Sequence, residues 1–296
     1  MPLDEVLDDG LRAHDLLLMG GVPGVGKTVA ALQMARNMAA AGSTAIYACY
    51  EHDEVDLLGR LLLLELGALA RREDAVVLDK LRVVVREAAQ GLRSLDVVGE
   101  GRALLDAARD AIADYADRLL LVCASGRHTG VAELEQLVTE HGNGTAALFV
   151  DYLQKVAVKP DPRDEGEKVT AIAEGLKELA LAHDCPVVAV VAADRASLDA
   201  RRLRMHHLRG SSALAYESDV VLILNEKFSC VSKVHLAYDA RRAETYRHYA
   251  VWSIEKNRSG PTGVDLEFRK DFAHYRFDPL GGHVAERLVD ERFDVD

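Results

Sequence analysis

A glycine-rich stretch near the N-terminus limits what this chain can fold into more than any other part of its sequence. Residues 21–28 read G-V-P-G-V-G-K-T, which is the G-x-x-x-x-G-K-[ST] pattern of a phosphate-binding P-loop. Residues 15–19 before it are mostly apolar and predict a short buried strand, while residues 29–35 after it predict a helix. A glycine turn between a strand and the start of a helix binds anions well, so we expect a nucleotide-binding α/β domain.

The residue types in this stretch fit the chemistry of a nucleoside triphosphate. Glycines lack a Cβ atom, which allows backbone N–H groups to turn toward phosphate oxygens. Lys27 supplies a positive charge for the β- and γ-phosphates, and the hydroxyl of Thr28 is a ligand for Mg²⁺. The sequence therefore predicts ATP and Mg²⁺ as cofactors, and a nucleotide-binding set that consists of Gly21, Gly24, Val25, Gly26, Lys27, Thr28 and Val29.

Two carboxylates follow predicted strands further along the chain. Residues 44–50 are β-branched and aromatic, and they end at Glu51; residues 145–150 are an apolar run that ends at Asp151. Ligands of open α/β sheets bind at the carboxyl ends of strands, so Glu51 is well placed for chemistry. An Asp at the tip of an apolar strand is typical of a Walker B motif, so Asp151 is predicted to hold Mg²⁺ directly or through water. The alternative for Glu51 is an exposed carboxylate at a strand end.

The rest of the chain alternates helical and strand patterns, which predicts an α/β fold with a mostly parallel central sheet flanked by helices. Its 296 residues are enough for a sizeable core, and 49% of them are hydrophobic. Residues 1–280 are expected to form one ATPase domain, and residues 281–296 an acidic tail that is a loose helix or disordered. Within the domain, helical patterns cover 28–41, 53–116, 131–138 and 169–183, strands are predicted at 118–124, 145–151, 186–193 and 219–224, and residues 230–277 read as β-rich.

Composition also limits where the protein works. No apolar run is long enough to cross a bilayer, and the acidic N-terminus shows no signal-peptide pattern. The cysteines lie far apart and have no metal-ligand spacing, so they are expected to be reduced thiols. These features predict a cytoplasmic protein without membrane contact.

The net charge of −12 argues against a surface coated with nucleic-acid-binding residues, but one local strip is basic. Residues 195–209 are rich in arginine and contain a single acid, Asp199. Guanidinium groups on such a loop would give salt-dependent affinity for single-stranded nucleic acid. No aromatic residue lies within the strip, so base stacking is not expected there. A solvated charged loop explains the strip equally well.

Several short segments together resemble the bacterial replicative helicases of the DnaB type. Residues 151–154 read D-Y-L-Q, like the Walker B signature of that family, and residues 256–263 read K-N-R-S-G-P-T-G, which differs from the family's K-N-R-N-G-P-T-G at one position. The segments L-K-E-L-A at 176–180 and L-R-G-S-S at 208–212 follow the family's order, and residues 3–15 resemble its lead-in. The resemblance covers nearly the whole chain. It implies a RecA-like P-loop NTPase motor domain that works as a homo-oligomer, in a hexameric ring around single-stranded DNA.

The resemblance also implies catalytic roles. Glu51 would polarise the attacking water, and Lys256 and Arg258 would reach the γ-phosphate bound by a neighbouring subunit. A guanidinium suits the last role because it neutralises the charge on phosphoryl oxygens through paired hydrogen bonds. The alternative for Lys256 and Arg258 is the charged rim of a hairpin. Arg60 falls where the family has an arginine near the nucleotide, and a solvated helix charge explains Arg60 equally well.

The resemblance bears on the basic strip too. In RecA-like motors the loops after the Walker B strand and after the next strand face the centre of the ring, and here these loops are residues 155–166 and 194–209. The analogy favours contacts with single-stranded DNA from Arg195, Arg201, Arg202 and Arg204.

The chain departs from the family pattern in ways that keep other functions open. The family's Q-L-N-R is A-A-D-R at 192–195, so the methyl group of Ala192 stands where a glutamine senses the γ-phosphate. Glu51 lies in C-Y-E-H where the family has S-L-E-M, and we expect this chain to lack the family's N-terminal helical domain and linker helix. One alternative is a RecA/RadA/KaiC-like ATPase that binds DNA or a partner without unwinding. Another is a nucleotide-dependent scaffold with slow turnover.

Overall fold

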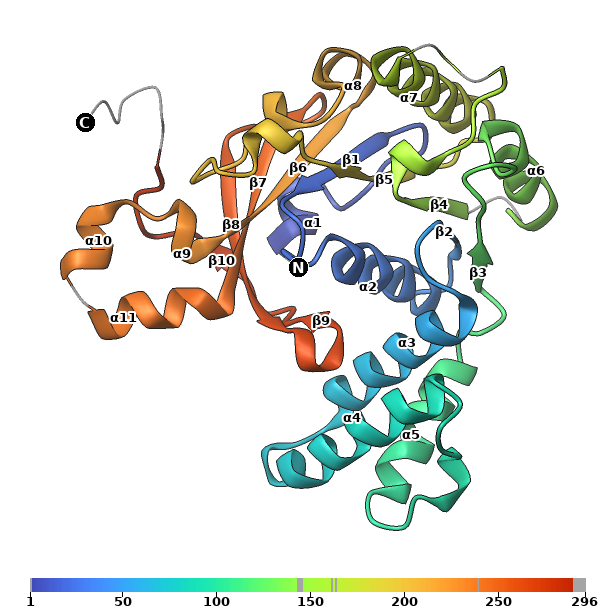
Figure 1. The fold of residues 1–296 in the computed structure, drawn as a ribbon, viewed down its shortest axis with the longest axis vertical. Coiled ribbons are helices and arrows are strands. Elements are labelled where there is room, and N and C mark those ends of the chain that lie inside the picture. The colour runs from blue at the N-terminus through green and yellow to red at the C-terminus, as the bar shows by residue number, and fades with distance from the viewer. Residues whose placement is uncertain (1, 143–145, 161, 163, 239, 290–296) are drawn as a thin grey trace.

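A ten-stranded sheet runs through the molecule in the order β10-β8-β7-β6-β1-β5-β4-β2-β3, with β9 paired to β8 (Figure 1). The computed structural model describes residues 2–142, 146–160, 162, 164–238 and 240–289. The parallel part of the sheet is formed by β1 (Leu16–Gly21), β2 (Thr44–Cys49), β3 (Leu119–Cys123), β4 (Ala146–Asp151), β5 (Val187–Ala192) and β6 (Val220–Glu226). The antiparallel part is formed by β7 (Tyr249–Asn257), β8 (Val264–Asp271), β9 (Arg276–Phe277) and β10 (Gly282–His283). The predicted fold class is confirmed.

Helices cover both faces of the sheet. One face carries α2 (Lys27–Ala40), and the other carries α6 (Val131–His141), α7 (Glu165–Ala182) and α8 (Ser211–Glu217). Three further helices, α3 (Glu54–Leu69), α4 (Ala75–Ala89) and α5 (Arg102–Ala113), gather below the sheet in Figure 1. The short helices are α1 (Pro2–Val6), α9 (Lys227–Cys230), α10 (Lys233–Tyr238) and α11 (Ala240–Thr245). Among the described residues, no helix combines the length and the apolar composition that a membrane span requires.

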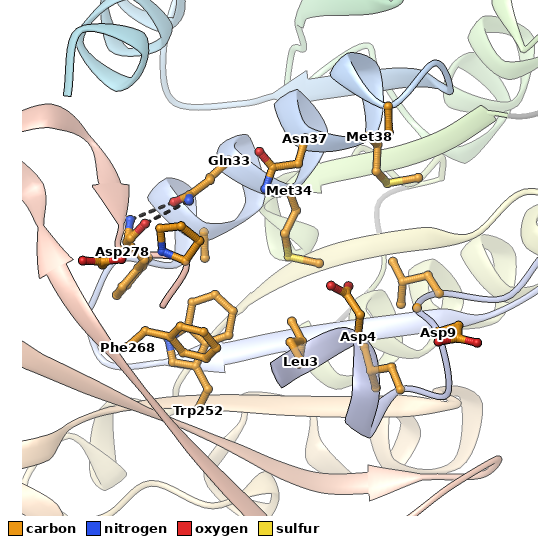
Figure 2. A pocket seen from close by; sticks show the side chains of 17 residues that line it. Leu3, Asp4, Asp9, Gln33, Met34, Asn37, Met38, Trp252, Phe268 and Asp278 are labelled. Atoms are coloured by element: carbon orange, nitrogen blue, oxygen red, sulfur yellow. Dashed lines mark hydrogen bonds between the residues drawn. The ribbon is translucent and has the colours of Figure 1, made fainter. Parts of the chain in front are cut away.

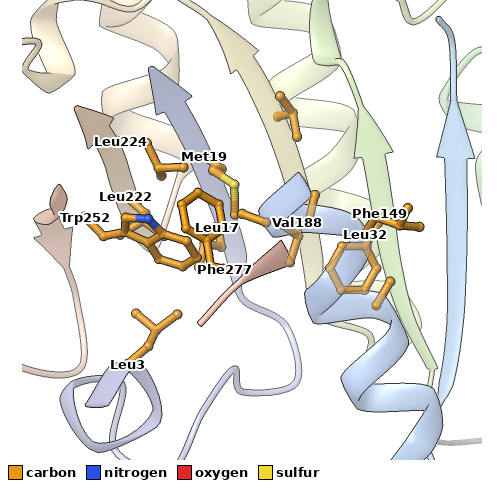
Figure 3. Close-up of a cluster of buried hydrophobic side chains, with 14 of the residues drawn as sticks. Leu3, Leu17, Met19, Leu32, Phe149, Val188, Leu222, Leu224, Trp252 and Phe277 are labelled. Atoms are coloured by element: carbon orange, nitrogen blue, oxygen red, sulfur yellow. The ribbon is translucent and has the colours of Figure 1, made fainter. Parts of the chain in front are cut away.

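Alternating residues of the central strands fill two separate cores. Leu17 and Met19 of β1 pack with Leu32 of α2 on one face, in the cluster that Figure 3 shows. Leu16 and Leu18 pack with α6 and α7 on the other face. Strands that are buried on both faces need unbroken apolar sequences, which is why residues 16–19 and 187–191 show no polar alternation.

Helices α3, α4 and α5 share a small core of their own, which includes Leu63, Leu66, Leu81 and Leu105. The first of them begins at Asp53, whose side chain accepts a hydrogen bond from the Asp56 backbone N–H. The helical pattern that the sequence shows over 53–116 is therefore confirmed, as three helices with short connections.

The β-rich pattern predicted for residues 230–277 is wrong in its first half. The described residues between β6 and Tyr249 include α9, α10, α11 and a 3₁₀ turn, and the antiparallel strands begin only at Tyr249. The alanines, arginines and glutamate of residues 240–245 favour a helix, and Ala243 and Tyr246 pack with Val231 in a small separate cluster. Val231 and Tyr246 favour strands by residue type but pack in that cluster instead.

The predicted loose tail is also wrong for residues 281–289. Strand β10 pairs with β8, and the backbone N–H of Val289 donates to the Cys230 carbonyl at 2.7 Å. The carboxylate of Glu286 is buried and lies 2.6 Å from the Lys227 ammonium. Residues 281–289, here called the C-terminal strap, are thus packed against β8 and α9. Residues 290–296 lie outside the described residues.

Candidate active site

The P-loop connects β1 to α2 at the carboxyl edge of the sheet. Gly24 and Gly26 have φ angles of +81° and +101°, in the left-handed region that glycine adopts readily. A Cβ atom at Gly26 would also stand 2.5 Å from the ring of Phe272. The turn therefore requires glycine at Gly26 for two reasons, and it directs the N-terminus of the long helix α2 at the space beyond the sheet.

Lys27 folds back over this turn. Its ammonium donates hydrogen bonds to the carbonyls of Gly21 at 2.8 Å and Val22 at 3.0 Å. Burial lowers the pKa of Lys27 to about 8, and the nearby carboxylates of Asp151 and Glu51 only partly oppose that effect. A phosphate arriving at the loop would stabilise the charged form of this lysine.

The predicted carboxylates lie beside the loop. In the β2–β4 pair Cys49 is opposite Asp151, so Glu51 and Asp151 leave the sheet at the same edge. Asp151 is buried and accepts a hydrogen bond from the Tyr47 hydroxyl at 2.9 Å. Burial is the largest cause of the raised pKa of Tyr47, which keeps its hydroxyl protonated and able to donate to the carboxylate.

A cavity of about 450 Å³ brings these groups together. Its wall includes Lys27, Thr28, Glu51 and Asp151, together with Pro23, Gly24, Gly26, Val29, Tyr152, Val190, Ala192, Phe272 and Tyr275. The Thr28 hydroxyl and the Asp151 carboxylate are hard oxygen donors, and Mg²⁺ commonly binds one or two such groups plus phosphate oxygens and water. The donor set therefore fits a magnesium nucleotide. The described residues contain no cluster of three or more His, Cys, Asp or Glu side chains that would hold a metal unaided.

The cavity has an aromatic wall that sequence reasoning missed. Phe272 and Tyr275 belong to the turn between β8 and β9, far from the P-loop in sequence. Phe272 packs edge-on against Phe277, with the ring centroids 5.3 Å apart. Tyr275 has a φ of +48°, which is uncommon for a residue with a side chain. The aromatic residues near the end of the predicted β-rich segment were the only indication of this wall in the sequence. Their contact with the P-loop could not be predicted, because the two segments are far apart in the sequence.

Arg60 does not line this cavity. Its guanidinium lies over the ring of Tyr275, 4.9 Å from the centroid, and contacts Asp56 at 3.0 Å and His52 at 3.1 Å. It supports the aromatic wall from behind. The structure thus places Arg60 against Tyr275 and not in the cavity, and its position near a nucleotide stays a prediction.

Lys256 and Arg258 lie at the opposite edge of the sheet. The Lys256 ammonium donates to the carbonyls of Ala215, at 2.7 Å, and Ser218. The Arg258 guanidinium contacts Asp219 at 3.1 Å, and Asp219 in turn accepts from the backbone N–H of Leu16, the first residue of β1. The P-loop leaves the other end of that strand, roughly 16 Å away at ~3.3 Å per residue. Both cations are thus far from the P-loop of their own chain.

The arginine strip divides into buried and exposed members. Arg202 is only 6% exposed and donates to Ser253 at 3.1 Å and to Asp265 at 2.5 Å. Its burial contradicts the predicted contact between Arg202 and DNA, since the guanidinium has almost no free surface. Arg204 pairs with Glu255 at 2.7 Å and Arg201 donates to the Val231 carbonyl at 3.0 Å, while Arg195 is exposed.

A second cavity, about 430 Å³ in volume, shares no lining residue with the first. Figure 2 shows its floor of Trp252 and Phe268, with Met34 and Met38 from α2 and the carboxylates of Asp4 and Asp9 around it. It lies between α1, α2 and the antiparallel strands and holds none of the predicted site residues. The residues suited to phosphate chemistry are therefore gathered at the P-loop cavity.

Comparison with known proteins decides the family. The family model described as the DnaB-like helicase C terminal domain matches residues 105–277, which is more than half of the chain. The chain belongs to this family. Both the D-Y-L-Q segment and the K-N-R-S-G-P-T-G segment lie within the matched residues, so the resemblance stated from the sequence is confirmed.

Curated relatives are named as replicative DNA helicases. Replicative DNA helicase DnaB of Treponema pallidum is 28% identical over 272 residues, which is 91% of this chain and 53% of that protein. Replicative DNA helicase DnaC of Bacillus subtilis shows 25% identity over 92% of this chain and 55% of its own length. The chain therefore spans about half the length of these DnaB-like relatives.

Solved structures agree on the fold. A DnaB-like replicative helicase, whose structure was studied with its primase interactions, superposes with a TM-score of 0.72 at 18% identity, over 93% of this chain and 59% of that one. A solved ATPase domain of similar size gives 0.73 at 19% identity, over 93% and 87% of the two chains. The RadB recombinase reaches 0.51 at 18% identity, over 90% and 92%. Among these structures, the fold is thus more similar to the ATPase domain and the DnaB-like helicase than to the recombinase.

Proposed function

We propose that this chain is an ATP-hydrolysing motor domain that moves along single-stranded DNA. The observation that carries the proposal is the meeting of Lys27, Thr28, Glu51 and Asp151 at one cavity, beside the N-terminus of α2. Membership of the DnaB-like family and the names of the replicative helicases among its relatives support the coupling to DNA.

The P-loop residues would bind the triphosphate. Backbone N–H groups around Gly24 and Gly26 and the charge of Lys27 would hold the phosphates, and Lys27 would exchange its present carbonyl partners for phosphate oxygens. Thr28 and Asp151 would hold Mg²⁺, which neutralises charge on the β- and γ-phosphates when it is bound. Tyr47 would keep the Asp151 carboxylate oriented through its hydrogen bond.

Glu51 would act on the water that attacks the γ-phosphate. Its carboxylate lines the same cavity as Lys27 and would accept the hydrogen bond that orients this water. The aromatic wall of Phe272 and Tyr275 would exclude bulk water from one side of the cavity and offer a flat apolar surface to the nucleotide base.

Lys256 and Arg258 would complete the site of a neighbouring subunit. They lie at the opposite edge of the sheet from their own P-loop, and the Arg258 side chain is 49% exposed. A head-to-tail ring brings opposite edges of adjacent subunits together, so the proposal includes a closed homo-oligomer, a hexamer by analogy with the family. Such a guanidinium accelerates phosphoryl transfer by ~10³–10⁵ in other NTPases.

Single-stranded DNA would pass the loop of residues 194–209, with the partly exposed Arg201 and Arg204 toward the phosphates of the DNA. The four cysteines of the chain are unpaired, which suits the reducing cytoplasm that we propose as its compartment.

The mass of the protein in solution tests the proposed assembly. We expect a non-hydrolysable ATP analogue with Mg²⁺ to shift the wild-type protein to a hexamer-sized species. The shift should need a higher protein concentration in Lys27→Ala, which weakens nucleotide binding, and in Arg258→Ala, which removes the contact in trans. A wild-type protein that stays monomeric under every condition would refute the ring.

The ATPase rate with and without single-stranded DNA tests the coupling. A motor should hydrolyse ATP faster when DNA is present, and it should separate the strands of a forked duplex. Stimulation without unwinding would instead identify a DNA-dependent ATPase that is not a helicase. An ATPase rate that does not change when DNA is added would refute movement along DNA but would leave the proposed ATP hydrolysis intact.

A further inference from the structure

A smaller cavity of about 280 Å³ adjoins the active-site cavity. It is lined by Gly21, Pro23, Lys27, Ala192, Ala193, Arg195, Leu198 and Arg209. Three of these residues, Pro23, Lys27 and Ala192, also line the active-site cavity. The two cavities therefore meet at the P-loop lysine, where the terminal phosphate of a bound triphosphate would lie.

Ala192 forms the floor of this junction. It ends β5, where it is paired with Gly21 of β1. Its methyl group has no hydrogen-bond donor to offer a phosphate. The polar side chains that remain on the wall of the smaller cavity are Lys27, Arg195 and Arg209.

The two arginines of this cavity, Arg195 and Arg209, differ in the partners that their side chains already have. The Arg209 guanidinium lies 2.9 Å from the carboxylate of Glu165, and both side chains are roughly half exposed. The Arg195 side chain is exposed, and within the part of the chain that the structure describes it shows no ion pair or side-chain hydrogen bond. Of the two arginines, Arg195 is therefore the one that can turn to a phosphate without giving up a carboxylate.

We propose that Arg195 binds the γ-phosphate of ATP held by the P-loop of its own subunit, and so supplies the donor that Ala192 lacks. The inference rests on the proposed ATPase function and adds a phosphate subsite to it. A guanidinium is suited to this task, because its fork of N–H groups binds two oxygens of one phosphate at once. ADP has no phosphate at this position, so the contact distinguishes the two nucleotides.

The same geometry links the subsite to the candidate DNA loop. Both ends of the loop are joined at β5: the Asp194 N–H donates to the His207 carbonyl at 2.8 Å, and the Arg209 N–H donates to the Ala192 carbonyl at 3.2 Å. Arg195 is the residue directly after Asp194, which makes the first of these two hydrogen bonds. A change in its position when the γ-phosphate leaves would thus be passed to residues 194–209, which carry the other arginines of the strip.

Nucleotide affinities measured with Mg²⁺ test the subsite, using a non-hydrolysable ATP analogue and ADP. Arg195→Ala should weaken binding of the analogue by roughly 10- to 100-fold, the range of a charge-assisted hydrogen bond, and leave the ADP affinity within about twofold. In the double variant Ala192→Gln/Arg195→Ala, the glutamine amide provides a donor again and should restore part of the preference for the analogue. Arg71→Ala, at an exposed arginine that lines neither cavity, is the matched control for loss of one positive charge.

Other outcomes would overturn the inference. Equal losses for the analogue and ADP would mean that Arg195 acts only through general charge. Unchanged affinities for both nucleotides, together with weaker binding of single-stranded DNA, would show that Arg195 contacts DNA and not the γ-phosphate of ATP. If the double variant regains none of the preference for the ATP analogue, then Arg195 does not replace a hydrogen-bond donor at position 192. The proposed ATPase function fails separately, if the wild-type protein binds neither nucleotide or if Lys27→Ala binds both as the wild type does.

Discussion

Lys27 is the residue whose titration should be visible in function. Its pKa of about 8 in the free protein means that it is charged below that pH and loses its proton above it. Phosphate binding favours the charged form, so the affinity for a non-hydrolysable ATP analogue should be constant just below pH 8 and fall by up to about tenfold per pH unit above it. Lys27→Arg is the control, because an arginine stays charged throughout this range. An equal fall in both proteins would contradict the assignment.

Glu51 is the residue whose removal should separate binding from chemistry. Glu51→Gln keeps the size and hydrogen-bonding capacity of the side chain but loses its basicity. We expect the affinity for ATP to stay within a few-fold of wild type, while single-turnover hydrolysis slows by about 10²- to 10⁴-fold. A variant that hydrolyses ATP at the wild-type rate would show that Glu51 is only a strand-end carboxylate.

The sequence identifies those site residues whose spacing is local. Residues 21–28 form a short continuous motif, and Glu51 and Asp151 each end an apolar run, so their convergence follows from the rule for parallel sheets. Tyr275 and Arg202 were beyond this reasoning, since one approaches the site by a long-range packing contact and the other turns inward to Asp265. A run of arginines in the sequence does not indicate which of these side chains form ion pairs with carboxylates from other parts of the fold.

At the scale of elements, the P-loop turn should depend on the aromatic turn between β8 and β9. Gly26→Ala places a methyl group against Phe272 in a backbone conformation with positive φ, whereas Gly42→Ala meets a similar φ of +99° in open space. Both variants should lose about 1 kcal/mol from strained backbone, and Gly26→Ala should lose ~1–3 kcal/mol more from overpacking. Unfolding in urea measures the difference. Equal stabilities of the two variants would show that Phe272 does not press on the loop.

The C-terminal strap should stabilise the fold through Glu286. Lys227 is buried and contacts both Glu286 and Glu267, so Glu286→Ala leaves the ammonium with one of two carboxylates and should cost ~1–3 kcal/mol. Burial raises the pKa of Glu286, but the hydrogen bond from Lys227 and its charge lower it more, so the net shift is downward. The stabilisation is therefore complete above the ordinary value of 4.5 and is lost as the pH falls below it.

An exposed ion pair provides the comparison for the strap. Lys80 and Glu100 lie 2.5 Å apart with both side chains more than half exposed, and Glu100→Ala should change the free energy of unfolding by less than about 1 kcal/mol. If Glu286→Ala destabilises the protein no more than Glu100→Ala does, the strap does not stabilise the fold in the way that the burial of Glu286 implies.

Sequence patterns predicted elements well where the chain is buried on both faces. Residues 187–192 and 220–224 are apolar runs, and they form strands as expected. Residues 230–248 were misjudged because valine and aromatic residues favour strands locally, whereas Tyr246 and Val231 are used in a small helical cluster under the strap. The strap itself was missed because acidic composition suggests disorder, and only the fold reveals the buried lysine that pairs with Glu286.

At the scale of the whole molecule, the two halves of the proposed site lie at opposite edges of one sheet. The P-loop follows the last residue of β1, while Arg258 is joined through Asp219 to the first residue of that strand. A rigid sheet cannot bring its own ends together, so in the proposed ring one molecule would hold half of each of two sites. Catalysis in the proposed motor would therefore take place between subunits.

Mixing two inactive variants tests that claim most directly. Lys27→Ala lacks a working P-loop but keeps Lys256 and Arg258, and Arg258→Ala has the opposite defect. Each alone should hydrolyse ATP at less than about a hundredth of the wild-type rate, given the effect of such groups in other NTPases. We predict that equal mixtures, assembled together, regain measurable ATPase activity, because some interfaces then join an intact P-loop to an intact Arg258. Mixtures that assemble as the wild-type protein does but stay as inactive as their components would contradict the account.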